Sequence, residues 1–251
     1  MSYLQVLLIF IVPVVLVESV IFTRVKDIEK TYFLKGIVLL AAAALVYTTP
    51  WDNYLIMTHV WSYEDDRVIG KIGYVPIEEY SFFILQTFLS GFWTYFIQRL
   101  FAIKEIPSQS RSGTRLVLSA TLVLWVASMF FLANPELRYM GLILAWSLPV
   151  IMLQWAVGGP YLLHNLKVYI LSLLPATIYL CLVDAIAIHL QVWKISMTQT
   201  TGLFIGPLPI EEATFFLVTN IMLIQGLILF KAMREKYPFL QKLRFFGKWS
   251  T

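Results

Sequence analysis

The chain has 251 residues, of which 59% are hydrophobic and 14% are charged, and its mean hydropathy is +0.75. Soluble domains carry about 25% charged residues, so this composition excludes an ordinary soluble protein. The net charge of +4 needs no nucleic-acid partner, because basic residues at membrane helix ends meet anionic lipid headgroups.

Seven apolar stretches are each long enough, at about 20 residues, to cross a ~30 Å hydrocarbon layer as a helix. They cover residues 3–22, 33–50, 79–99, 116–133, 138–157, 168–189 and 210–231. The first lacks a basic start and a cleavage site and contains Glu18, so we expect a mature helix there and not a secretory signal. The sequence therefore predicts an all-α membrane protein with seven transmembrane helices.

The lysines and arginines are unevenly distributed between these helices. Fifteen of the 19 fall on one side and four on the other. Because cytoplasmic loops carry the excess of positive charge, this predicts a multi-pass protein of the cell membrane. The N-terminus is expected outside and the C-terminus in the cytoplasm.

An internal repeat runs through the chain. The stretch Pro-Ile-Glu-Glu-x-x-Phe-Phe occurs at residues 76–83 and again at 209–216, and an aspartate precedes a tryptophan by nine positions in both Asp52–Trp61 and Asp184–Trp193. The offset of 132 or 133 residues aligns helices 1–3 with helices 5–7. An unmatched fourth helix is what two three-helix units of the same orientation require, so we expect two parallel repeats joined by one reversing helix.

The domain boundaries follow from that repeat. Residues 1–105 form the first three-helix repeat, residues 106–135 the linker and reversing helix, and residues 136–251 the second repeat with a basic cytoplasmic tail. Residues 104–113 are rich in turn formers, as expected of a linker.

Six repeated acids are expected at the outer membrane face, where helices 2 and 6 end and helices 3 and 7 begin. They are Asp52, Glu78, Glu79, Asp184, Glu211 and Glu212. A proline followed by glutamates also suits the first turn of any helix, where carboxylates favour the dipole. Charge at membrane depth is costly, however, so ionisable residues there are functional candidates.

The residues that follow the glutamates favour a functional role. Glu79 is followed at helical spacing by Gln86 and Ser90, and Glu212 by Thr219. Polar groups in a membrane must find partners inside the bundle, so these stripes are expected to face inward. Adjacent carboxyls in a dry site cannot both ionise cheaply, and a protonated carboxyl in an apolar pocket is suited to general-acid attack on an alkene.

Aromatic residues cluster near the acids and are expected to stabilise a cation or line a substrate cavity. Electron-rich ring faces stabilise desolvated cations by about 1–2 kcal/mol each, although Trp and Tyr are also common as interfacial anchors. The cluster includes Trp51, Phe82, Phe83, Phe215 and Phe216.

We expect no metal and no cofactor. His59 and His189 have no partner at metal-ligand spacing, the run Glu64-Asp65-Asp66 has no second acidic pair, and Cys181 is the only cysteine. No GxGxxG element occurs in the chain, so the usual dinucleotide signature is missing. The predicted chemistry is redox-neutral.

At this point the sequence resembles the membrane-integral lycopene cyclases, whose two cyclase domains are separate chains in some bacteria and fused in archaea and fungi. The resemblance rests on the doubled Pro-Ile-Glu-Glu-x-x-Phe-Phe. It is supported by the segments Pro50–Asn53, Val183–Asp184, Ala145–Pro149 and Gln154–Trp155.

The resemblance implies a cofactor-free lycopene β-cyclase. Such enzymes protonate the ψ end of lycopene and close a β-ionone ring, giving β-carotene by way of γ-carotene. It implies Glu78, Glu79, Glu211 and Glu212 as acid and base candidates, with Glu78 and Glu211 expected first. Asp52 and Asp184 would support them, and Trp155 joins the expected substrate-lining residues. The implied partners are lycopene and membrane lipids, and the oligomeric state stays open.

Two other classes are weaker. Three-helix parallel repeats joined by one helix also occur in small-molecule transporters, but these are expected to place amides and hydroxyls at the midplane, whereas this chain concentrates acids at one face. A retinal-binding receptor would need a lysine in the middle of the last helix, and that helix has none before Lys231.

Overall fold

The computed structural model describes residues 1–27, 29–101 and 111–236, and it is built of long helices. The helices are α1 (Tyr3–Val6), a π-helical turn η1 (Leu7–Ile11), α2 (Val12–Arg24), α3 (Lys30–Met57), α4 (Ile77–Leu100), α5 (Arg111–Ala133), α6 (Arg138–His164), α7 (Leu166–His189) and α8 (Ile210–Lys236). Each of the seven predicted spans corresponds to one long helix or, for the first, to α1, η1 and α2 in series. Most of the predicted linker and the basic tail lie outside the described residues.

Six of the described segments are long and apolar enough to cross a membrane, so the protein is a multi-pass membrane protein. They are Tyr3–Arg24, Lys30–Met57, Ser112–Ala133, Pro135–His164, Leu166–His189 and Ile210–Met233. Helix α4 has the required length, about 36 Å for 24 residues, but falls outside this apolar set. The reason is its polar interior, with Gln86, Thr87, Ser90 and Thr94 all buried.

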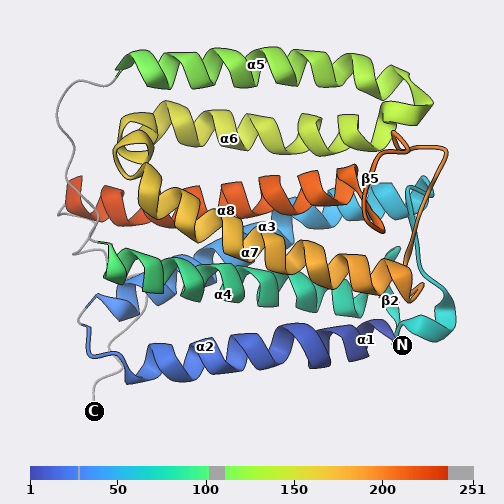
Figure 1. Ribbon diagram of the computed structural model, residues 1–251, viewed down its shortest axis with the longest axis horizontal. Helices are drawn as coiled ribbons and strands as arrows, with labels where there is room; N and C mark the ends of the chain where they lie inside the picture. Colours follow the sequence, from blue (N-terminus) through green and yellow to red (C-terminus); the bar gives the residue numbers. More distant parts are fainter. Residues whose placement is uncertain (28, 102–110, 237–251) are drawn as a thin grey trace.

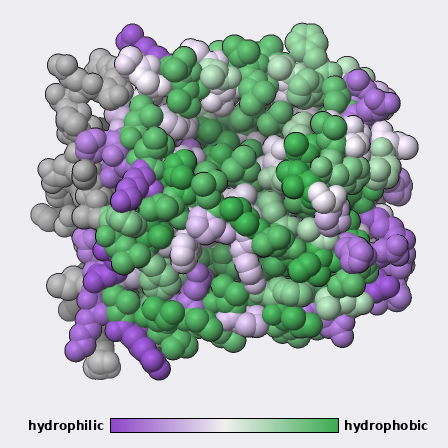
Figure 2. Space-filling model, in the orientation of Figure 1, coloured by the Kyte–Doolittle hydropathy of each residue, from purple (hydrophilic) through white to green (hydrophobic). Residues whose placement is uncertain are grey.

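Helices α4 and α8 lie at the centre of the bundle. Helix α4 packs against α2, α3, α7 and α8, and α8 packs against α3, α4, α6 and α7. Figure 1 shows the long helices roughly side by side, with α5 and α2 at opposite edges. Helix α5 packs on α6, and only 11% of the most apolar stretch of α5 is buried inside the protein. Figure 2 shows an apolar belt between two polar ends, as expected when the bundle axis crosses the bilayer.

The predicted polar stripes face inward and join the two central helices. Gln86 Nε2 donates to Thr219 Oγ1 at 3.1 Å, and Ser90 Oγ donates to Asn220 Oδ1 at 2.7 Å. Asn220 Nδ2 donates onward to Thr177 Oγ1 on α7 at 3.2 Å. Each bond satisfies a polar group that would otherwise be unpaired in the apolar interior.

Prolines and glycines account for two differences from the predicted helix ends. The second predicted helix stops at Pro50, yet α3 continues through that proline to Met57. A proline removes one backbone donor without ending a helix whose neighbours hold it in place. Helix α6 extends to His164, seven residues past its predicted end, but it kinks at Gly158, whose φ is −143°. The kink follows immediately after the predicted end at residue 157.

Three short strand pairs close one end of the bundle. Two are hairpins, β2 (Lys71–Ile72) with β3 (Val75–Pro76) and β5 (Phe204–Ile205) with β6 (Leu208–Pro209). The third joins loops far apart in sequence, because β1 (Trp61–Ser62) pairs antiparallel with β4 (Lys194–Ile195). An ion pair between Lys194 and Glu64 fastens the same two loops. This capped end also holds the N-terminus (Figure 1).

The opposite end carries a polar cluster around Asp27, in the connection between α2 and α3. Its Oδ2 accepts a hydrogen bond from Tyr95 Oη at 2.8 Å and pairs with Arg99 Nη1 at 3.0 Å. Burial acts to raise the pKa of Asp27, but the Glu29 backbone N–H, Tyr95 and Arg99 together lower it below its ordinary value. The cluster fixes the connection between α2 and α3 to the end of α4.

Candidate active site

The two repeated glutamate pairs begin helices α4 and α8 at the capped end. In each case a tight hairpin precedes the helix, with Gly73 at φ +66° and Gly206 at φ +63°. That left-handed conformation favours glycine because it has no Cβ. Pro76 then stands directly before Ile77, where its missing N–H is not needed by the helix. All four glutamates are at most 5% exposed, so none lies in bulk solvent.

Glu78 and Glu211, the outer glutamates, hold the preceding loops. Glu78 Oε1 accepts a hydrogen bond from the backbone N–H of Ile69 at 2.8 Å, and Glu211 Oε1 accepts one from that of Thr201 at 2.7 Å. The second oxygen of each is buried and has no hydrogen-bond partner in the described residues. The outer pair therefore acts on loop backbone.

Glu79 and Glu212, the inner glutamates, are held by aromatic side chains. Tyr3 Oη and Tyr63 Oη both donate to Glu79 Oε2 at 2.8 Å. Tyr139 Oη and Trp61 Nε1 both donate to Glu212 Oε1, at 2.7 and 3.1 Å. Each inner carboxyl thus has one oxygen that accepts two hydrogen bonds and a second oxygen that takes part in neither of them.

Asp52 and Asp184 complete a cluster with the inner glutamates. Asp52 is fully buried, and neither of its carboxylate oxygens has a hydrogen-bond partner among the described residues. It interacts electrostatically with both Glu79 and Glu212. Asp184 accepts a hydrogen bond from Trp193 Nε1 at 2.9 Å and interacts with the same two glutamates. The ends of α3 and α7 and the starts of α4 and α8 therefore bring four carboxyl groups into one site. We call this site the acid cluster, and its members are Asp52, Glu79, Asp184 and Glu212.

The acid cluster affects the pKa of the loop residue Tyr63. Burial raises the pKa of its phenol well above the usual value, and the charges of Glu79, Asp52 and Glu212 raise it further. No ion pair found in the described part of the chain reaches these carboxyls. Hydrogen-bond donors surround the acid cluster, but no described residue pairs with it as a cation that would balance its charge.

A small cavity lies among these groups. Its volume is about 40 Å³, enough for a few water molecules, and Glu79, Glu212 and Asp184 supply its polar wall. Its apolar wall includes Phe82, Phe215, Phe216, Leu180, Val183, Trp61 and Trp193.

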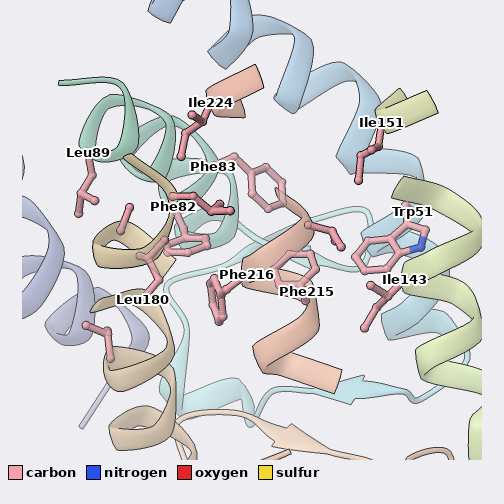
Figure 3. Close-up of a cluster of buried hydrophobic side chains, with 14 of the residues drawn as sticks. Trp51, Phe82, Phe83, Leu89, Ile143, Ile151, Leu180, Phe215, Phe216 and Ile224 are labelled. Carbon is pink, nitrogen blue, oxygen red and sulfur yellow. The ribbon is translucent and has the colours of Figure 1, made fainter. Parts of the chain in front are cut away.

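The aromatic residues form a continuous layer beside this cavity. Phe82 and Phe216 meet edge to face with ring centroids 6.1 Å apart, and Trp51 stacks on Phe215 at 5.6 Å. Figure 3 shows Phe82, Phe83, Phe215 and Phe216 gathered between α4 and α8, with Trp51 beyond Phe215. The predicted rings other than Trp155 are thus brought together.

Trp155 lies elsewhere. It is buried on α6 beside Gly159, seventeen residues past the start of that helix at Arg138, or about 25 Å along its axis. It lines neither the small cavity nor the larger cavity between α3, α4, α6 and α8.

Sequence reasoning missed the tyrosines that bind the inner glutamates. Tyr3, Tyr63 and Tyr139 are separated from their partners by 76, 16 and 73 positions, so no helical spacing connects them. A weak signal existed, since Tyr3 and Tyr139 open the first and fifth predicted helices near the repeat offset. No group of His, Cys, Asp or Glu in the described ranges is arranged to hold a metal ion.

Comparison with known proteins identifies the family. The family model described as lycopene cyclase matches residues 1–97 and 138–231. The chain belongs to the lycopene cyclase family. Both glutamate pairs and both aspartates fall inside the matched residues, whereas the whole of α5 falls outside them.

Relatives in archaea and fungi agree with this lycopene cyclase assignment. The chain is 41% identical to "Lycopene beta-cyclase" of Halobacterium salinarum, over 78% of this chain and 81% of the relative. It is 35% identical to "Bifunctional lycopene cyclase/phytoene synthase" of Aspergillus niger, over 76% of this chain but only 34% of that longer protein. The corresponding protein of Colletotrichum graminicola is 36% identical over 84% of this chain and 36% of its own length. No solved structure gives a significant match.

Proposed function

We propose that this enzyme is a lycopene β-cyclase of the membrane, acting as an isomerase without net oxidation or reduction. The single observation that carries the proposal is the acid cluster, in which buried carboxyls and aromatic rings line one cavity. The archaeal relative named lycopene beta-cyclase, at 41% identity, supports the same substrate.

The proposed reaction begins with proton transfer. One inner glutamate donates a proton to the terminal double bond of the ψ end, which leaves a tertiary carbocation. The C5–C6 double bond attacks that cation and closes the six-membered ring, moving the charge to C5. Loss of the proton at C6 to a second carboxylate gives the β-ionone ring. One proton is gained and one is lost, so the product is an isomer of the substrate.

The environment of the inner glutamates supports that role. Four buried carboxyls without a cationic neighbour cannot all be charged at low cost, so the acid cluster retains a proton for donation. Tyr139 and Trp61 hold Glu212, and Tyr3 and Tyr63 hold Glu79, by one oxygen each, which orients the other. The outer glutamates bind loop amides instead, so we propose Glu79 and Glu212 for proton transfer.

The aromatic layer suits the cationic intermediate. Phe82, Phe215 and Phe216 line the cavity next to the acids, and ring faces stabilise a desolvated cation without attacking it as nucleophiles. Trp51 stacks on Phe215, and Phe83 lies close to the same ring (Figure 3). Water exclusion matters too, because a carbocation exposed to water would be captured as an alcohol.

The organisation proposed from sequence has support from matched contacts. Asp52 and Asp184 occupy corresponding places near the ends of α3 and α7, and each outer glutamate accepts a backbone N–H from the loop before its helix. We propose two parallel three-helix repeats, residues 1–105 and 136–251, joined by the linker and α5. We also propose that the capped end lies on the outer side of the cell membrane and the C-terminus in the cytoplasm.

The test is expression in a bacterial host that makes lycopene and no cyclic carotenoid. We expect β-carotene, with γ-carotene as an intermediate, when the pigments are separated by chromatography. The double variant Glu79→Gln/Glu212→Gln, inserted at the same level in the membrane, is the matched control and should leave lycopene unchanged. Unchanged lycopene with the wild-type protein correctly inserted would contradict the proposal, and lycopene moving into empty liposomes without conversion would favour a transporter.

A further inference from the structure

A second, larger cavity lies between α3, α4, α6 and α8. Its volume is about 300 Å³, which is within the usual range of small-molecule sites, and we call it the lateral cavity. On α8 its lining runs from Phe215 to Leu223, eight residues or about 12 Å along the helix axis. It therefore extends from the neighbourhood of the acid cluster towards the middle of the membrane.

The lateral cavity opens towards lipid. Ala43 and Tyr47 of α3 line it and are also exposed, and Val46 and Leu153, on the flanking helices α3 and α6, are 78% and 64% exposed. Across the opening, Tyr47 Oη donates to the backbone oxygen of Trp146 at 2.8 Å, and the two rings stack at 5.4 Å. The exposed side chains beside this opening, Val46 and Leu153, are apolar, as expected of a lipid-facing surface.

The polar side chains of the lateral cavity are largely turned into the protein. Gln86 Nε2 donates to Thr219 Oγ1, Thr87 Oγ1 donates to the backbone oxygen of Phe83, and Gln154 Nε2 donates to that of Met222. Two buried lining atoms lack a partner in the described residues, Trp146 Nε1 and Gln154 Oε1. They are eight residues apart on α6, about 12 Å along the axis, too far to bind one polar group. The lining therefore favours an apolar ligand.

The side chain of Phe215 lies between the lateral cavity and the small cavity at the acid cluster, because it lines both. Phe215 lines both cavities, with Phe83 on the lateral side and Phe82 on the acid side. Glu212 precedes Phe215 by three residues, so the two side chains lie on one face of α8. A change in the rotamer of Phe215 would join the two spaces into one channel from the bilayer to the inner glutamates.

We propose that the lateral cavity binds the linear, conjugated part of a polyene that enters from the bilayer between α3 and α6, while its end group passes Phe215 to the acids. This inference rests on the proposed cyclase function, which supplies the identity of the occupant. The small cavity holds only a few waters, so the rest of a long apolar chain needs a second space next to it.

The experiment fills the lateral cavity from two sides. Ala43→Phe and Val150→Phe place a ring in its lining, from α3 and α6 respectively. Matched controls add the same ring to the exposed neighbours Ala42 and Leu153, which do not line it. Binding is measured in lipid nanodiscs with the methyl ester of parinaric acid, a conjugated tetraene, by energy transfer from tryptophan. The KM for lycopene is measured in parallel.

We expect both filling variants to raise the dissociation constant of the tetraene and the KM for lycopene at least tenfold, and both controls to stay within twofold of wild type. Equal values in filling and control variants of normal thermal stability would overturn the inference even if cyclisation is normal. Competition by saturated lipid chains as strong as by polyenes would also overturn it, since the cavity would then be a lipid site. Tetraene binding that depends on the cavity in a protein that never cyclises lycopene would instead refute the proposed function alone.

Discussion

Exchanging each glutamate for glutamine separates the roles proposed for the inner and outer pairs. Glu212→Gln keeps the side-chain volume and an oxygen that can accept the bonds from Tyr139 and Trp61, but it removes the proton-transfer group. Loss of a general acid or base costs about 10²–10⁴ in rate, so we expect kcat to fall by that factor with little change in thermal stability. Glu79→Gln is expected to behave in the same way.

The outer variant Glu211→Gln provides the matched control. Its oxygen still accepts the N–H of Thr201, but the bond changes from charge-assisted to neutral, a loss of about 1 kcal/mol. A helix-start charge of this kind contributes a further ~0.3–1 kcal/mol. We therefore expect a lower melting temperature and less than a tenfold change in kcat, and the same for Glu78→Gln.

The assay uses purified protein in liposomes loaded with lycopene, with initial rates from chromatography and unfolding followed in detergent. If the outer variants lose as much turnover as the inner ones at equal stability, the division of roles is wrong. Inner variants that keep more than a tenth of wild-type kcat would equally refute proton transfer by Glu79 and Glu212.

Three further changes test other contacts. Tyr139→Phe removes one of two donors to Glu212, and since a hydrogen bond to a charged group is worth about 1.5–3 kcal/mol, kcat should fall roughly tenfold or more while KM changes little. Gly91→Val should lower stability by about 1–3 kcal/mol in thermal unfolding, because even a Cβ at Gly91 would lie 2.8 Å from Ile37; an unchanged melting temperature would contradict this close packing. The lowered pKa of Asp27 stabilises the fold above its unfolded pKa of about 4, and that stability is lost as pH falls through the folded value. Asp27→Asn should therefore be less stable at neutral pH and lose less stability on acidification than wild type.

Helix positions were predictable from sequence because the hydrocarbon layer sets both length and composition. The start of α8 at Ile210 and the end of α7 at His189 agree with the predicted spans. Errors arose at Pro50 and near Gly158, where residues that usually end helices lie inside α3 and α6. Whether a proline or glycine ends a helix in a membrane depends on contacts with neighbouring helices. The local sequence pattern carries no information about those contacts.

The acid cluster was only partly predictable. The repeat identified the acids, and the inward polar stripe was correct because Gln86 has no other way to satisfy its amide in a membrane. The distinction between Glu78 and Glu79 was not available, since adjacent residues on a helix point about 100° apart and only the fold decides which one meets Tyr3. The resemblance favoured Glu78 and Glu211 as the first candidates for proton transfer. The proposed mechanism assigns that role to Glu79 and Glu212 instead.

The pairing of β1 with β4 has a consequence for how pigments would travel. It joins the two loops above the acids, and the ion pair between Lys194 and Glu64 fastens them. A pigment that arrives through the lateral cavity would never leave the hydrocarbon phase, and neither would its cyclised product. Supply and removal would then depend on two-dimensional diffusion among neighbouring membrane enzymes, with no role for a water-soluble carrier.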